Sequence, residues 1–145
     1  PNDIKKILEE ALKNPGTIIN GMCEINNEKD FRSVNVPKVV YSKNGRLLYM
    51  SRAGIPSNKK NGFLKAKKQV CIYAFPRSAL LDFGQQKTKL PIEEIEDIEI
   101  IRFLELGYKI KMVDVKGSAI AVDTKEDLNR VKRIIKEKNK KIGWI

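Results

Sequence analysis

The chain has 145 residues, of which 41% are apolar and 32% charged, and its formal net charge is +11. This length and composition predict a single globular domain over residues 1–145 and exclude disordered and fibrous proteins. No apolar run is long enough to cross a bilayer, so we expect no membrane partner. Cys23 and Cys71 lie within apolar runs and not in a C-x-x-C spacing, which predicts buried, reduced thiols and a cytoplasmic location.

The first residues show helical spacing of apolar side chains directly after Pro1, with no initiator Met. We therefore expect a fragment of a larger protein. The apolar period predicts a helix over residues 2–13, ended by the Pro and Gly of residues 14–16, and a β-branched run predicts a strand over 17–25.

A β-hairpin is the clearest local signal in the chain. Residues 36–41 and 46–51 are strand-like, and Asn44-Gly45 between them is the favoured pair where a tight turn needs positive φ. Residues 53–62 contain two Gly, one Pro and two Asn, which predicts an exposed, mobile loop. Hairpin and loop together make an expected arm over about residues 36–68.

The second half of the chain alternates strand and helix patterns. In chain order the expected elements are a buried central strand over 70–75, a helix over 77–83, a long helix over 90–107, strands over 108–113 and 119–122, and a helix from Thr124 to about Lys138. This alternation, with one antiparallel hairpin, predicts an α/β fold with a partial, open, mostly parallel sheet and flanking helices.

Asp123 directly follows the last expected strand, at the carboxyl end where open sheets bind ligands. A carboxylate there can ligate a hard cation such as Mg²⁺ that bridges phosphate oxygens. It can equally be a polar residue that only ends the strand before Thr124 caps the next helix. One carboxylate rarely makes a magnesium site, and we identify no second acid at an equivalent strand end.

Other side chains suit the binding of a polar ligand. Arg52 follows the hairpin and is either a fork for a carboxylate or a surface cation. Gln69 and Tyr73 are four residues apart on one strand, so both point to the same face and can bind hydroxyl groups. The acids between Glu93 and Glu99 are mostly expected at the surface. The chain has no His and no glycine-rich phosphate motif, which excludes His-based catalysis and the common nucleotide loops.

The positive charge gathers over residues 130–141 and 59–68. Val131, Ile134 and Ile135 interrupt the first cluster at helical spacing, which favours a solvated helix with an apolar stripe facing the core. Only 7% of residues are aromatic, and no nucleic-acid-binding motif is present, so we do not expect a nucleic-acid partner. A stand-alone basic binding module nevertheless remains the alternative from another functional class.

The order and spacing of several motifs resemble a known enzyme family. These motifs are Lys38-Val39-Val40, Leu48 to Ala53, Ile55-Pro56, Ile72-Tyr73, Ile95 to Glu99, Gly107 to Ile110 and Val122 to Leu128. Over nearly its whole length the chain resembles the carboxyl-terminal half of the CMP-Kdo synthetases, the 3-deoxy-manno-octulosonate cytidylyltransferases. The CMP-sialic acid synthetases are the nearest alternative. The resemblance implies an incomplete fold of the nucleotide-diphospho-sugar transferase type.

This resemblance also implies an activity. These enzymes join CMP from CTP to an acidic sugar with Mg²⁺ and release pyrophosphate, for lipopolysaccharide biosynthesis. Asp123 matches a metal-binding aspartate, and Arg52, Tyr73 and Glu99 match residues of the acidic-sugar pocket. The hairpin arm matches the region through which the family forms homodimers. The family's amino-terminal half, with its CTP loop and second metal-binding aspartate, is absent, so we expect the fragment alone to be inactive.

Three positions depart from the family pattern. Gln69, which we place in the sugar pocket, stands where the family has a His, and Phe75 and Ile100 replace polar or aromatic partners. The resemblance therefore leaves open which acidic sugar is bound.

Overall fold

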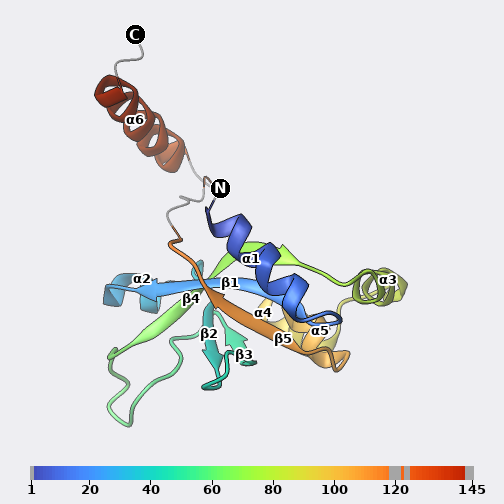
Figure 1. The fold of residues 1–145 in the computed structure, drawn as a ribbon. Helices are drawn as coiled ribbons and strands as arrows, with labels where there is room; N and C mark the ends of the chain where they lie inside the picture. Colours follow the sequence, from blue (N-terminus) through green and yellow to red (C-terminus); the bar gives the residue numbers. More distant parts are fainter. Residues whose placement is uncertain (1, 118–121, 123–124, 143–145) are drawn as a thin grey trace.

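A computed structural model describes residues 2–117, 122 and 125–142. Figure 1 shows its elements, which are α1 (Asn2–Lys13), β1 (Ile18–Ile25), α2 (Glu28–Arg32), β2 (Lys38–Tyr41), β3 (Leu47–Ser51), β4 (Ala66–Ala74), α3 (Arg77–Gln85), α4 (Pro91–Glu96), α5 (Ile100–Glu105), β5 (Ile110–Asp114) and α6 (Lys125–Ile142). The strand expected over residues 119–122 falls almost entirely outside the described residues. Among the described helices, none combines the length and apolar composition that a bilayer crossing requires.

The strands of the described residues form one five-stranded sheet in the order β3-β2-β4-β1-β5. β1 runs parallel to β5, whereas the β1–β4, β2–β3 and β2–β4 pairs are antiparallel. The α/β class is confirmed, but the sheet is mixed where the sequence predicted a mostly parallel one. Between β1 and β4 the chain makes a hairpin and a loop, and parallel neighbours would need a crossover connection instead.

Helices cover both faces of this sheet. α1 runs across β1 and β5 (Figure 1), and its buried Ile7 packs with Ile19 and Val113 on one face. The larger core lies on the other face, where Met22 and Phe103 belong to a cluster that also takes residues from α3 and β3. The sheet is therefore the middle layer of three, as in other α/β folds.

The long helix predicted over residues 90–107 is two helices, α4 and α5. Asp97 between them has a left-handed backbone (φ 50°) that ends α4. The carbonyls of Glu96 and Asp97 accept hydrogen bonds from the Arg52 side chain, at 2.7 and 2.8 Å, instead of continuing a helix. A contact from a distant strand thus overrides the local helix signal, which the sequence period alone could not reveal.

A buried ion pair joins the two short helices. Glu93 of α4 is fully buried, and its carboxylate takes two hydrogen bonds from Arg102 of α5, at 2.5 and 2.7 Å. The same carboxylate accepts the Leu90 backbone N–H at the start of α4, and the Arg102 guanidinium lies over the Phe83 ring at 4.0 Å. The pair fixes α4 against α5 and α3.

The tip of the β2–β3 hairpin returns to the far edge of the sheet. Arg46 forms an isolated antiparallel bridge with Lys111, and the Met112 N–H donates to the Gly45 carbonyl at 2.8 Å. Gly45 has φ +83°, and a Cβ there would lie 3.1 Å from the Met112 carbonyl oxygen, so the turn and this close approach both require glycine. The hairpin predicted from Asn44-Gly45 is confirmed.

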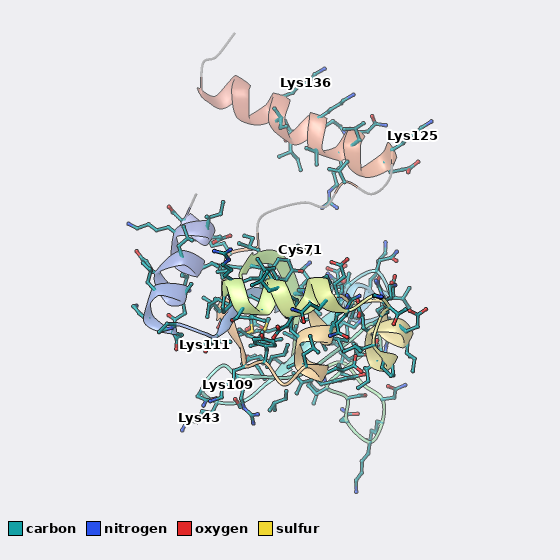
Figure 2. All side chains as sticks on the ribbon, turned by 90° about the vertical axis from the view of Figure 1, so that its right-hand side faces the viewer. Lys43, Cys71, Lys109, Lys111, Lys125 and Lys136 are labelled. Atoms are coloured by element: carbon teal, nitrogen blue, oxygen red, sulfur yellow. The ribbon has the colours of Figure 1, made fainter. Side chains whose placement is uncertain are left out.

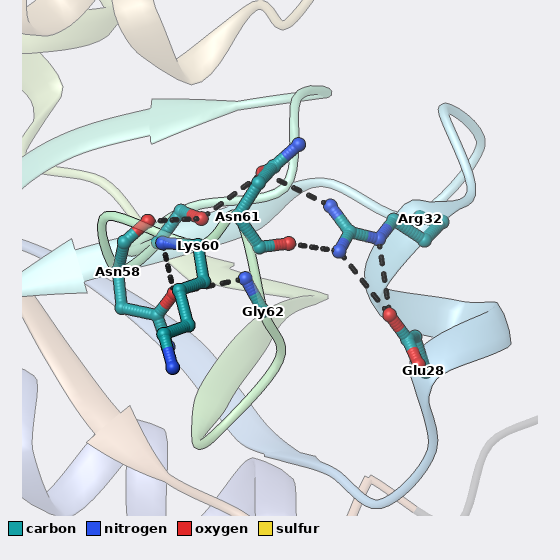
Figure 3. A network of polar contacts seen from close by, with 7 residues as sticks. Glu28, Arg32, Asn58, Lys60, Asn61 and Gly62 are labelled. Carbon is teal, nitrogen blue, oxygen red and sulfur yellow. Dashed lines mark hydrogen bonds and ion pairs between the residues drawn. The ribbon is translucent and has the colours of Figure 1, made fainter.

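The loop after the hairpin is exposed, as predicted, and polar contacts tie its tip to α2 (Figure 3). Arg32 donates to the Asn61 side chain at 3.2 Å and to the Asn61 carbonyl, and it pairs with Glu28 at 3.2 Å. Asn58 accepts the backbone N–H groups of Lys60 and Gly62 at 2.9 and 3.0 Å, which closes the tip on itself.

α6 is a helix, as predicted, with basic side chains such as Lys125 and Lys136 along it (Figure 2). Its apolar stripe was expected to face the core. Of its three residues, Ile135 is 52% exposed and Val131 and Ile134 are half-buried, and no described α6 residue joins a core cluster.

Candidate functional site

The candidate site is built on an irregularity in β4. Asn20 of β1 pairs with Tyr73, but the next residue, Gly21, pairs with Val70, so Cys71 and Ile72 are extra residues on β4. Such a bulge interrupts the ladder of backbone hydrogen bonds and redirects side chains. Asn20 is fully buried and donates its side-chain N–H groups to the carbonyls of Val70 and Ile72, at 3.0 and 3.1 Å. The Asn20 amide therefore gives these two carbonyls the hydrogen-bond donors that the interrupted backbone ladder does not supply.

Gln69 and Tyr73 meet beside this bulge. Gln69 Nε2 donates to the Tyr73 hydroxyl at 3.0 Å and to Asn20 Oδ1 at 3.4 Å. The Tyr73 ring stacks on Phe75 with 5.4 Å between centroids. The contact confirms that Gln69 and Tyr73 share one side of the strand. Two polar groups therefore lie together next to the apolar Phe75 ring.

Burial raises the pKa of Tyr73 above its usual value, and the neighbouring Cys71 and Glu99 raise it further. The phenol therefore stays protonated at neutral pH and keeps a hydrogen to donate. Glu99 is exposed at the start of α5, and its negative charge contributes to the raised pKa of Tyr73. The structure thus joins Gln69 to Tyr73 by a hydrogen bond, and the sugar-binding roles of Gln69, Tyr73 and Glu99 stay predictions.

Cys71 corrects the expectation that both thiols are buried. Cys23 is buried in β1, whereas Cys71 is exposed, and both are free thiols. Figure 2 labels Cys71. β4 is the middle strand of the sheet, as predicted, but residues 70–75 are half-buried or exposed where the sequence predicted burial, and Cys71 is an extra residue of the bulge.

Arg52 belongs to a separate network at the end of β3. Its guanidinium donates to the carbonyls of Val34, Glu96 and Asp97, at 2.9, 2.7 and 2.8 Å. Its backbone N–H donates to the Glu96 carboxylate at 2.9 Å, and the buried Lys38 ammonium donates to its carbonyl at 2.5 Å. Much of the Arg52 donor set therefore holds the hairpin to α4. Asp97, whose carbonyl accepts from Arg52, lies two residues before Glu99 in the sequence.

Two residues that sequence reasoning missed organise these groups. Glu96 was counted among surface acids, but its carboxylate also accepts from Ser51 and Tyr49, at 2.6 and 3.0 Å. These hydrogen bonds outweigh the effect of burial, which by itself raises the pKa, and they hold the Glu96 pKa below its usual value. Asn20 gave a signal that was available, since Asn next to Gly21 inside an apolar strand is unusual and indicates a bulge.

The predicted metal ligand, Asp123, lies outside the described residues. Within the described part of the chain, no three Cys, Asp or Glu side chains gather as a metal site would require. Asp114 does end β5, but Lys67 binds its carboxylate, and Glu24 pairs with the same ammonium at 3.4 Å. The described residues therefore supply no metal site by themselves.

A pocket of about 190 Å³ lies elsewhere, between β2, the start of β4 and the loop. Its walls are Val39, Val40, Tyr41, Pro56, Lys65, Ala66 and Lys67. None of Arg52, Gln69, Tyr73 or Glu99 contributes to it. The candidate site is thus a surface on the sheet and not this pocket.

Comparison with known proteins confirms the resemblance seen in the sequence. The chain is 40% identical to the 3-deoxy-manno-octulosonate cytidylyltransferase of Fusobacterium nucleatum, over 80% of this chain and 47% of the relative. It is 39% identical to the enzyme of the same name from Acidobacterium capsulatum, over 78% and 46%. No protein-family model matches the chain.

The fold comparison agrees. A solved CMP:2-keto-3-deoxy-manno-octonic acid synthetase in complex with CTP superposes with a TM-score of 0.85 and 25% identity, over 95% of this chain and 57% of that one. The chain therefore spans about half the length of the cytidylyltransferases it matches.

Proposed function

We propose that this chain is the sugar-binding and dimerisation half of a CMP-Kdo synthetase. The observation that carries the proposal is the 40% identity to a 3-deoxy-manno-octulosonate cytidylyltransferase over 80% of the chain. In the reaction, the anomeric hydroxyl of the sugar attacks the α-phosphorus of CTP and loses its proton, and pyrophosphate leaves. We expect the enzyme to work in the cytoplasm, in lipopolysaccharide biosynthesis.

The described residues suit the sugar of this reaction. Gln69 and the protonated Tyr73 offer hydrogen bonds to sugar hydroxyls above the Phe75 ring. Glu99, exposed at the start of α5, would add an acceptor for a sugar hydroxyl. Arg52 keeps part of its guanidinium donor set after its three bonds to carbonyls, and we propose that this part binds the sugar carboxylate.

We further propose that Asp123 supplies one carboxylate to a Mg²⁺ ion and that the other ligands come from a part of the protein outside residues 1–145. Mg²⁺ is normally held by one or two carboxylates together with substrate phosphates, so a single aspartate fits as part of such a set. The ion would supply stabilisation of the charge that develops on the phosphate oxygens. The hairpin arm, residues 36–68, would pair with a second copy.

The test is pyrophosphate release from CTP and 3-deoxy-manno-octulosonate, measured with the natural full-length protein and Mg²⁺. Asp123→Asn should lower turnover by about a hundredfold, because it removes a charged metal ligand. Glu126→Gln, which removes an exposed acid of α6 three residues later, is the matched control and should leave turnover unchanged. Undiminished turnover by Asp123→Asn would reject the metal assignment.

The same assay separates the alternatives. Turnover of sialic acid and not of 3-deoxy-manno-octulosonate would indicate an enzyme of the CMP-sialic acid synthetase type. No turnover of either sugar, together with tight and strongly salt-dependent binding of DNA or RNA, would indicate a basic binding module. The isolated 145-residue chain should release no pyrophosphate.

A further inference from the structure

The direction of the Asn20 side-chain amide is fixed by its surroundings. One end of this amide faces the carbonyl oxygens of Val70 and Ile72, at 3.0 and 3.1 Å. Carbonyl oxygens only accept hydrogen bonds, so the nitrogen must be at this end. The Asn20 oxygen Oδ1 therefore points the other way, toward Gln69.

This fixes the Gln69 amide in turn. The atom of Gln69 that approaches Asn20 Oδ1 at 3.4 Å must be the nitrogen, because two oxygens cannot share a hydrogen bond without a hydrogen. The same nitrogen donates to the Tyr73 hydroxyl at 3.0 Å. Both amide hydrogens of Gln69 are thus used inside the protein.

What remains for a ligand is one acceptor and one donor side by side. Gln69 Oε1 accepts no hydrogen bond from any described residue, and it is not sealed away from solvent. The Tyr73 oxygen already accepts from Gln69, so its own hydrogen is directed elsewhere. Cys71 is the neighbouring group there, and a thiol is only a weak acceptor.

We propose that Asn20 is a positioning residue that sets the amide of Gln69, so that Gln69 Oε1 accepts from one sugar hydroxyl while Tyr73 donates to its neighbour. The inference rests on the proposed sugar-binding function and states which arrangement of sugar hydroxyls the site recognises. The site selects ligands with two neighbouring hydroxyls, of which one donates to Gln69 Oε1 and the other accepts from the Tyr73 hydroxyl. A rigid pair of this kind rejects ligands that lack either partner, because a polar group then loses its hydrogen bond.

The amide direction can be tested without turnover, by NMR of the natural full-length protein. We expect the Gln69 side-chain amide hydrogens to exchange slowly and to show nuclear Overhauser contacts to the Tyr73 ring and to Asn20. Contacts that place Gln69 Oε1 against Tyr73 would overturn the proposal.

Kinetics then test the role in specificity. Gln69→Glu keeps the shape but cannot donate to Asn20 or Tyr73, so the KM for the sugar should rise about tenfold or more, with the KM for CTP within about twofold. Gln85→Glu, an exposed residue of α3, adds the same charge elsewhere and should change neither KM. If the sugar KM of Gln69→Glu equals that of the wild type, the inference fails.

Asn20→Thr tests the positioning role, since Thr is well tolerated in strands and can donate to only one of the two carbonyls. The sugar KM should rise several-fold in the wild-type background and should not rise further in the Gln69→Glu background. Equal effects in both backgrounds would show that Asn20 acts only on stability and would refute the positioning role. If the wild-type protein turns over neither sugar nor CTP, the proposed function fails; an active wild type with unaffected variants refutes only the present inference.

Discussion

The buried Glu93–Arg102 pair gives a prediction with a defined magnitude. Arg102→Met keeps most of the side-chain volume but removes both hydrogen bonds to the fully buried Glu93 carboxylate, at 2.5 and 2.7 Å. Removing one partner of a buried pair costs about 3–5 kcal/mol, because the other charge is left uncompensated. Total stabilities are about 5–15 kcal/mol, so we expect a large fraction of the unfolding free energy to be lost.

The pH dependence of this loss has a definite sign. Burial by itself raises the Glu93 pKa, but the hydrogen bonds from Arg102 outweigh it, and the pKa lies below its usual value. In the wild type, the stabilisation is present above the unfolded pKa of about 4.3 and is lost as pH falls through the lowered folded pKa. In Arg102→Met the effect of burial is opposed only by the Leu90 N–H and the charge of Lys89, so the Glu93 pKa rises and Glu93 takes up a proton more easily. The difference between the two proteins should therefore be largest near pH 7 and should narrow below about pH 5.

Urea denaturation followed by circular dichroism measures both effects, with an unchanged m-value as the check that the same transition is compared. The double variant Glu93→Gln/Arg102→Met removes the buried charge as well and should recover more than half of the lost free energy. A loss below about 1 kcal/mol in Arg102→Met, or a double variant no more stable than the single one, would refute this reasoning.

Three further outcomes follow from the same structure. Gly117→Ala should destabilise the protein by about 1–3 kcal/mol, because Gly117 has φ +58° and a Cβ there would lie 2.5 Å from the Cys23 sulfur; Cys23→Ala should recover part of that loss in thermal denaturation. Lys67→Met should destabilise the protein most at neutral pH. Burial by itself lowers the Lys67 pKa, but the bond to Asp114 raises it by more, so the net pKa is raised. The stabilisation by Lys67 is therefore present below the unfolded pKa of about 10.4 and is lost as pH rises through the raised folded pKa. Absorbance titration should show Tyr73 ionising above the usual tyrosine range, and Tyr73→Phe should remove that late step; an unchanged titration curve would contradict the raised pKa of this phenol.

Local signals were sufficient for most of the elements. The helical period of α1, the Asn44-Gly45 turn and the apolar run of β4 each predicted an element that the structure contains. The errors arose where distant residues decide the outcome. Arg52 binds the carbonyls at the α4 end and breaks a helix that the sequence pattern continues.

The same reason limited the prediction of the site. Gln69 and Tyr73 could be placed together because they share one strand, and their contact confirms it. Asn20 lies about fifty residues away in sequence, and its role depends on how β1 and β4 pair. Glu96 likewise acts on β3 across forty-five residues, at Ser51. Periodicity reports which face a side chain occupies, but not which strand will lie opposite.

The bridge between Arg46 and Lys111 has a consequence for solubility. β3 and β5 are the outermost strands in the sheet order, and exposed strand edges are templates for aggregation. The hairpin tip uses part of the β5 edge, because Met112 donates its N–H to Gly45 there. Lys43 and Lys109 lie on this side of the molecule (Figure 2), whereas the Lys111 ammonium pairs with Glu10, and unpaired lysines beside an edge repel a second strand. The hairpin tip thus also protects part of this edge from pairing with other chains.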